Sequence, residues 1–243
     1  MGEFYTHEAK PNFYEADDAN DVATGAYVGN LDTFYFPQAF SEYAVFGDAT
    51  FHATDHFDVQ IGGREAWSRQ TYQEIATGPD IYSLFHVPSP YIQPRQQANS
   101  NAFTFLVVPE YKFSPDLMVY ARVASGYQVG GPNFSTSQGQ PASYRPDTTR
   151  NYEIGIKGAV DDHLLSFDAS LYYIDWRDIQ LTVILPSVSY VTNGGRAKSE
   201  GVEFSGEAHP VRGLRISASG SYCDAVLQQR GQHTRPAGRL LFK

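Results

Sequence analysis

The segment TTRNYEIGIKGAVDDHLLSFDASLYYIDW, residues 148–176, decides the fold of this chain. In its first half the apolar side chains of Tyr152, Ile154 and Ile156 alternate with polar ones. In its second half, Leu165 to Tyr173, every other residue is again apolar. A two-residue period is typical of a β-strand with one apolar face. The pair Asp161-Asp162 between the halves predicts a tight turn, so the segment is read as an antiparallel hairpin.

The same alternation recurs on both sides of this hairpin, and helical periodicity is weak throughout. Segment 103–113 is apolar on both faces, and 2–9 is predicted to be a further strand. The other predicted strands are 41–52, 57–68, 117–126, 196–208 and 213–225. These segments make about nine long strands, close to the length that a tilted membrane strand requires.

The connections between the predicted strands are either very short or very long. The four short ones are Ala53-Thr54-Asp55-His56, Ser114-Pro115-Asp116, Asp161-Asp162 and His209-Pro210-Val211-Arg212-Gly213. The long loops cover about 10–40, 69–102, 127–147 and 177–195, far above the usual connection length. Short periplasmic turns and long outer loops are typical of outer-membrane barrels. We therefore predict an all-β, antiparallel up-and-down meander that forms a partial, open outer-membrane β-barrel.

Composition excludes some classes of function. The net charge of -9 and the pI of about 5.2 argue against nucleic-acid binding, which needs a basic surface. A single cysteine, Cys223, cannot form an internal disulfide. No run of about eighteen apolar residues is present, so no transmembrane helix is expected. The N-terminus lacks the features of a signal peptide, which leads us to expect a fragment of an outer-membrane protein.

Charged residues on the polar side of the strands are predicted to line a wet barrel lumen. The predicted lumen-lining residues are Tyr120, Arg122, Glu153, Lys157, Glu203 and Glu207. A β-sandwich would also have one polar face, because that face is solvated. Alternation alone does not separate the barrel from the sandwich, whereas the unequal connections favour the barrel.

Ligand recognition is expected in the long loops, where Tyr127, Asn133, Phe134 and Tyr190 are the candidate contacts. These residues are equally suited to packing the loops together. No catalytic arrangement, cofactor site or metal site is predicted. His52 and His56 flank a predicted turn, and the acidic stretch 15–21 lacks the glycine and the final glutamate of an EF-hand loop.

Several motifs go beyond periodicity and occur in order along the chain. Tyr144-Arg145-Pro146-Asp147 precedes Asn151-Tyr152-Glu153-Ile154-Gly155-Ile156-Lys157, and upstream lie Val119-Tyr120-Ala121-Arg122, Gly126-Tyr127 and Gly130-Gly131-Pro132-Asn133. Downstream lie Tyr172-Tyr173, Asp175, Asp178-Ile179-Gln180, then Asn193-Gly194-Gly195-Arg196-Ala197 and Ser199-Glu200-Gly201-Val202-Glu203. Together these motifs resemble those of TonB-dependent outer-membrane receptors.

The resemblance implies a plugged barrel of about 22 strands that lies in the outer membrane of a Gram-negative bacterium. Such a receptor imports a scarce nutrient (siderophore-iron, cobalamin or an oligosaccharide) with energy from TonB, and it is not an enzyme. Residues 1–243 would then be a barrel segment without plug or final strands, ending inside an outer loop after a strand near Tyr222. Its expected partners are outer-membrane lipid, a small nutrient ligand and, in the full-length receptor only, the TonB complex.

Two alternatives remain open at this stage. One is a soluble all-β carbohydrate-binding module or glycosidase, in which Glu203 and Glu207 would be the paired carboxylates. The other is a passive, porin-like channel. A soluble module predicts two sheets packed face to face, whereas the receptor predicts one curved, open sheet.

Overall fold

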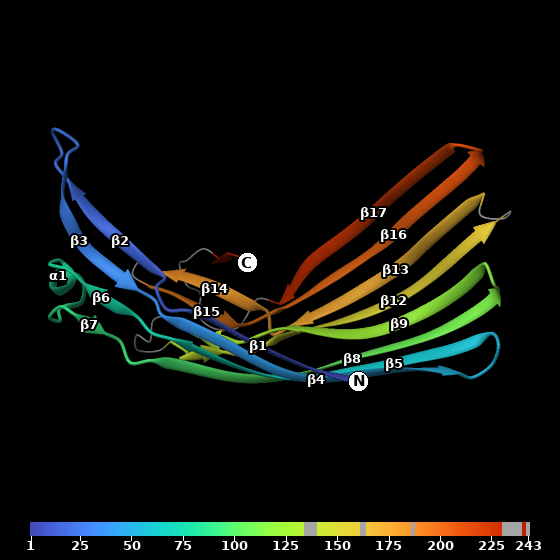
Figure 1. Cartoon of the computed structure of the whole chain (residues 1–243), viewed down its shortest axis with the longest axis horizontal. Coiled ribbons are helices and arrows are strands. Elements are labelled where there is room, and N and C mark those ends of the chain that lie inside the picture. Colours follow the sequence, from blue (N-terminus) through green and yellow to red (C-terminus); the bar gives the residue numbers. More distant parts are fainter. Residues whose placement is uncertain (134–139, 161–163, 186–187, 230–239, 242–243) are drawn as a thin grey trace.

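One large antiparallel sheet dominates the computed structural model, which describes residues 1–133, 140–160, 164–185, 188–229 and 240–241 (Figure 1). Neighbours in the sheet follow one another along the chain, so its topology is an up-and-down meander. Its nine strands are β1 (Gly2–Lys10), β4 (Gln38–His52), β5 (Phe57–Tyr72), β8 (Gln96–Ser114), β9 (Leu117–Gln128), β12 (Asp147–Val160), β13 (Leu165–Arg177), β16 (Arg196–Val211) and β17 (Leu214–Gln229). The predicted open meander of about nine long strands is confirmed.

The quoted segment 148–176 forms the hairpin of β12 and β13. Tyr152 lies opposite Tyr173, and Lys157 lies opposite Asp168. Since directly opposed residues project from the same face, the register places the apolar side chains of both strands on one face. The predicted turn at Asp161-Asp162 lies outside the described residues.

The tight turns lie at one end of the sheet and the longer connections at the other (Figure 1). At the first turn, the backbone N–H of Ala53 donates to the carbonyl of Phe57 over 2.9 Å. The last predicted turn is tighter than expected, because β16 runs to Val211 and only Arg212-Gly213 connects it to β17. Gly213 has a φ of 87°, a left-handed conformation that glycine adopts without a steric cost.

One boundary prediction was wrong. Residues 96–102, assigned to a long loop, belong to β8, which pairs with β5 from Gln96 onward. This stretch, QQANSNA, has polar residues on both faces and therefore no alternation to detect. Strands β5 and β8 thus extend past the apolar region as a fully polar ribbon.

The apolar face of the sheet is uncovered. Ile154 is 59% exposed and Leu171 is 55% exposed. No second sheet packs on this face in the part of the chain that the structure describes. Other exposed apolar side chains of the same face are Tyr43, Val45, Trp67, Phe103, Tyr111, Phe113, Tyr152, Tyr173, Val202, Phe204 and Tyr222.

The few buried apolar side chains lie elsewhere. Ala44, Ala66 and Val108 belong to the polar face of the sheet, and Ile81 and Leu181 belong to the outer connections. The described part of the chain therefore forms no central core beneath the apolar face of the sheet. Among the described residues, none of the helices is both long enough and apolar enough to cross a membrane.

The long connections are themselves folded into two groups of short elements. The first, which we call the acidic module, comprises residues 11–37 and 73–94. It contains β2 (Tyr14–Asn20), β3 (Tyr27–Tyr35), β6 (Ile75–Thr77), α1 (Ile81–Phe85) and β7 (Tyr91–Ile92). Its four strands form one sheet in the order β2-β3-β6-β7, at the far end from the tight turns (Figure 1).

The second group, which we call the amide module, comprises 128–133, 140–147, 178–185 and 188–195. It contains β10 (Gly131–Pro132), β11 (Ser143–Tyr144), β14 (Gln180–Leu185) and β15 (Val188–Asn193). Strand β14 also pairs with β18 (Leu240–Leu241). The predicted loops are thus largely hairpins, which the sequence did not reveal because they lack a regular apolar face.

Candidate functional site

The polar face of the sheet carries a network centred on Glu153. The hydroxyl of Tyr120 donates to a Glu153 carboxylate oxygen over 2.7 Å, and Asn151 Nδ2 donates to the other oxygen over 3.1 Å. An Arg122 guanidinium nitrogen lies 3.7 Å from the same carboxylate. Lys157 Nζ lies 3.0 Å from Asp168 Oδ2. Neighbouring strands thus satisfy the charges of this face among themselves.

All six residues predicted to line the lumen lie on this face. Glu153 pairs in register with Arg122, and Lys157 pairs with Asp168. On β16, Glu203 lies opposite Ser170 on one side and Ser221 on the other. Their assignment to a closed lumen stays a prediction, whereas their common face follows from the register.

Glu203 and Glu207 are not arranged like the carboxylates of a glycosidase. They are four residues apart on one extended strand, which separates their backbone positions by about 13 Å. Glycosidase carboxylates lie about 5–9.5 Å apart. Glu207 is moreover bound to Arg215 and to His209, whose Nε2 lies 2.7 Å away. The pair therefore gives no support to the glycosidase alternative.

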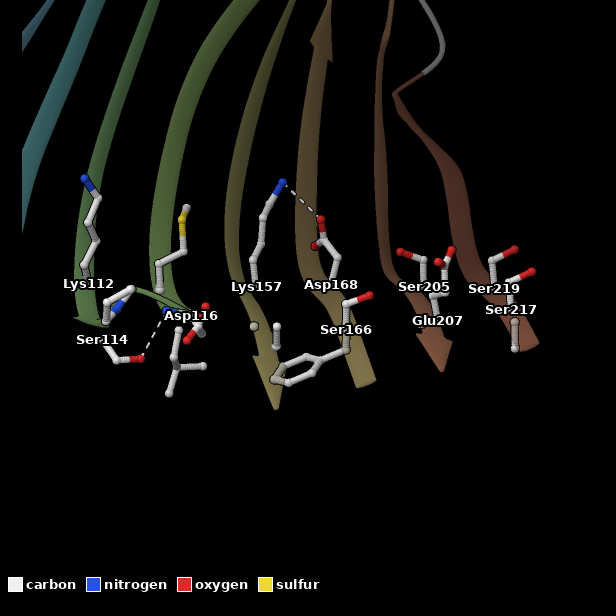
Figure 2. A pocket seen from close by; sticks show the side chains of 18 residues that line it. Lys112, Ser114, Asp116, Lys157, Ser166, Asp168, Ser205, Glu207, Ser217 and Ser219 are labelled. Carbon is white, nitrogen blue, oxygen red and sulfur yellow. Dashed lines mark hydrogen bonds and ion pairs between the residues drawn. The ribbon is translucent and has the colours of Figure 1, made fainter. Parts of the chain in front are cut away.

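The polar face is hollowed near the tight turns, as Figure 2 shows. This open hollow has a volume of about 660 Å³. Its polar lining comes from five strands, with Lys112, Ser114, Lys157, Ser166, Asp168, Ser205, Glu207, Ser217 and Ser219 among the residues. Hydroxyl groups and paired charges suit contact with water or with a polar protein surface.

Tyr127, a predicted ligand contact, lies at the end of β9 and reaches across the polar face. Its hydroxyl donates to Glu42 Oε2 over 2.9 Å and accepts from Arg64 Nη1 over 3.1 Å. Arg64 Nη2 lies 2.5 Å from Glu42 Oε1. This triad connects β4, β5 and β9. Sequence reasoning missed Glu42 and Arg64, although both occupy the polar phase of their strands.

Asn133, a second predicted contact, holds the amide module together. Its side chain is buried, and Nδ2 donates to the carbonyls of Pro141 and Val191, each over 2.8 Å. Its Oδ1 accepts from the backbone N–H of Val191 over 2.7 Å. Tyr190 is a half-buried residue of β15, and Phe134 lies outside the described residues.

Two further amides connect the same loops: Gln180 and Asn193 belong to the quoted motifs but were not among the predicted contacts. Gln180 Nε2 donates to the carbonyl of Val129 over 2.9 Å. Asn193 Oδ1 accepts from the backbone N–H of Arg145 over 2.6 Å, and its Nδ2 donates to the carbonyl of Asp178 over 2.8 Å. Isolated polar residues in a loop carry no periodic signal, so only the tertiary structure shows which groups these two amides bind.

The two histidines noted in the sequence have separate partners. His52 Nδ1 lies 2.7 Å from Asp58, which also accepts from Lys112 Nζ over 2.6 Å. His56 Nδ1 lies 2.9 Å from the carbonyl of Lys112. Within the described residues, no three His, Cys, Asp or Glu side chains are grouped closely enough to hold a metal ion together.

Comparison with known proteins identifies the family. The sequence model of the TonB-dependent receptor-like β-barrel matches residues 2–237, nearly the whole chain. The chain therefore belongs to this family, which places it in the outer membrane of a Gram-negative bacterium. This membership, with the single-layered sheet, excludes the soluble carbohydrate-binding module.

The related proteins are receptors much longer than this chain. The pesticin receptors of Yersinia enterocolitica and Yersinia pestis are 26% identical over 162 residues, which cover 66% of this chain and 22% of theirs. This chain thus spans about a fifth of the curated relatives it matches.

Two solved structures share the fold. The ferric yersiniabactin uptake receptor of Yersinia pestis has a TM-score of 0.66 and 21% identity, over 82% of this chain and 29% of that one. The ferric-catecholate import receptor of Escherichia coli K12 has a TM-score of 0.70 and 17% identity, over 93% and 34%. Both likenesses support a barrel wall rather than a complete barrel.

Proposed function

We propose that residues 1–243 form part of the barrel wall of a receptor that imports a scarce nutrient with energy from TonB. The segment performs no chemistry: it crosses the membrane and presents outer loops to the nutrient. Its short turns face the periplasm, and its two loop modules face the outside, as in bacterial outer-membrane barrels.

The uncovered apolar face carries this proposal. Between Leu165 and Tyr173 the side chains on this face of β13 are uncharged over about 26 Å of strand, and Asp175 follows directly. The opposite face holds the Glu153 network. Water on both sides would leave an apolar sheet face unburied, whereas lipid on one side and a wet lumen on the other satisfy both faces.

Siderophore-iron is the nutrient class that we place first, ahead of cobalamin and oligosaccharides. The support comes from similar proteins, which include receptors for ferric yersiniabactin and ferric catecholates. Tyr190 and Phe134 are the proposed ligand contacts. Tyr127 and Asn133 are proposed to hold the loop between them in place, because both are hydrogen-bonded to other segments of the protein.

A matched pair of substitutions tests the orientation of the sheet. We expect Ile154→Arg, on the lipid face, to destabilise the folded barrel by about 2–4 kcal/mol and lower its amount in the outer membrane. Glu203→Arg, on the polar face, is the control and should leave that amount near the wild-type value. Equal effects of the two substitutions, measured by membrane fractionation and heat-modifiable gel mobility, would contradict the proposed faces.

Import is tested in a receptor-deficient strain under iron limitation. The receptor that contains this segment should restore uptake of a labelled ferric siderophore. The 243-residue chain alone should not, because β1 and β17 have no outer neighbours in the described sheet and lipid does not tolerate unpaired strand edges. Growth supported by this chain alone would refute its role as a barrel segment.

A further inference from the structure

The acidic module has an extreme local charge. Residues 11–37 contain five acidic residues and no lysine or arginine, and residues 73–94 contain two more acidic residues and again no lysine or arginine. The acidic residues are Glu15, Asp17, Asp18, Asp21, Asp32, Glu74 and Asp80. The amide module, by contrast, contains Arg145 beside its acidic residues Asp147 and Asp178. In the acidic module, mutual repulsion of the carboxylates opposes the compact fold.

One of these carboxylates is buried without a partner. Asp32, on β3, is 3% exposed, and its Oδ1 has no hydrogen-bond donor. Its direct cross-strand neighbour is Asp17 on β2. Like charges directly opposite each other destabilise a sheet, and a buried carboxylate without a donor is costly.

The segment that passes over Asp32 carries a further acidic residue, Asp80. At Gly78, with a φ of 140°, an added Cβ would lie 2.2 Å from the Leu31 carbonyl oxygen and 2.7 Å from Asp32 Cα, so this chain passes very close to β3. The backbone N–H of Asp80 donates to the carbonyl of Leu31 over 3.4 Å. Burial, then Asp80 and then Asp17 raise the pKa of Asp32, with no compensating base or donor.

Other carboxylates in the acidic module do have hydrogen-bond donors. Asp18 accepts from Asn30 Nδ2 over 3.1 Å, and Asp21 accepts from the N–H of Thr24 over 2.7 Å. Asn30 Nδ2 also donates to the carbonyl of Asp32 over 2.9 Å. Among the described acidic residues of this module, Asp32 is the one that is buried and has a carboxylate oxygen without a donor.

We propose that the paired carboxylates of Asp32 and Asp17 form a divalent-cation site in the acidic module and that its ion is Ca²⁺. Two carboxylates do not fill the shell of Ca²⁺, which takes 6–8 oxygen ligands, so water and main-chain oxygens complete an open site. Extracellular sites of this kind bind at about 10⁻⁴–10⁻³ M, a range suited to a loop outside the cell. Only this outward orientation rests on the proposed function.

The first experiment measures hydrogen exchange of β2 and β3 by mass spectrometry, in the receptor purified in detergent micelles. With a dissociation constant of about 1 mM, 10 mM CaCl₂ should slow exchange about tenfold relative to EGTA. Asp32→Asn should remove this response and protect the module without Ca²⁺, because a neutral amide replaces the buried charge. Asp17→Asn, at an exposed position, should weaken the response without unfolding the module.

The matched control is Asp55→Asn in the tight turn at the other end of the sheet, which should keep the full Ca²⁺ response. Tb³⁺ luminescence provides a direct readout, since Tyr14 and Tyr35 lie on the same two strands. No Ca²⁺ effect on the wild-type protein, or an equal effect on Asp32→Asn, would overturn the site. Since nutrient uptake is not measured, failure here is distinct from failure of the proposed function.

Discussion

The two loop modules bury polar groups in opposite ways. In the amide module, Asn133 is buried and every polar atom of its side chain has a main-chain partner. In the acidic module, Asp32 is equally buried, and its Oδ1 has none. An amide both donates and accepts, so the backbone alone can satisfy it, whereas a carboxylate needs a donor or a cation. The buried side chain of Asn133 is thus fully hydrogen-bonded within the protein, whereas that of Asp32 is not.

The largest loss of stability is expected on substitution of Asn133, which bonds the segments of the amide module to one another. Asn133→Ala leaves the N–H and carbonyl of Val191 and the carbonyl of Pro141 without their partner. Each buried polar group left without a bond costs about 1–3 kcal/mol, so local opening should become easier by roughly 3 kcal/mol. Hydrogen exchange of β14 and β15 should rise about a hundredfold. Asn99→Ala, on the polar ribbon of β8, is the control.

A smaller effect is expected from the close approach in the acidic module. Gly78→Ala places a Cβ against the Leu31 carbonyl at a φ of 140°, whereas at Gly25, with a φ of 70°, nothing lies within 4 Å. At Gly25 the left-handed backbone alone costs an alanine about 1–2 kcal/mol, and at Gly78 the backbone region that glycine alone adopts readily costs about 1–3 kcal/mol. Gly78→Ala should destabilise β3 and β6 by at least about 1 kcal/mol more. Equal protease sensitivity of the two variants would contradict the close contact between Gly78 and β3.

The stability of the acidic module should depend on pH through the protonation of Asp32. Because its pKa is raised in the folded state, the folded module binds a proton more tightly than the unfolded chain. Without Ca²⁺, the module should therefore lose stability as pH rises from the usual Asp range through the raised pKa of Asp32. Exchange protection of β3 measured between pH 4 and 7 in EGTA should fall, and Asp32→Asn should flatten this profile.

The smallest effect, of opposite sign, is expected at exposed Asp21. Hydrogen bonds from Thr24 and Ala23 lower the pKa of its carboxyl. The stability that this turn contributes should thus persist above the usual pKa of Asp and disappear as pH falls through the lowered one. In Asp21→Asn, the protection factors of the Ala23 and Thr24 amides, corrected for intrinsic exchange, should be lower than in the wild type at neutral pH and should not change as pH falls below 4. A response of the same sign as that of Asp32 would contradict the contrast between the two groups.

Predictability from the sequence differed along each strand. Where a strand has one lipid face and one wet face, as at Ile154 and Glu153, the alternation revealed both the strand and its orientation. Where β8 leaves the apolar region at Asn101, both faces are polar, and the prediction was wrong. The loop residues showed the same limit: Tyr127 was singled out, but its partners Glu42 and Arg64 lie 85 and 63 residues away.

By itself, the sequence determined a meander of long strands with one apolar face, and its motifs resembled those of an outer-membrane receptor family. The strand pattern is local information, since the two-residue period lies in consecutive side chains. Only the tertiary structure decided which polar groups of the loops are satisfied. Asn133 and Asp32 are both single polar residues in loops, and their difference depends on groups brought to them by distant segments.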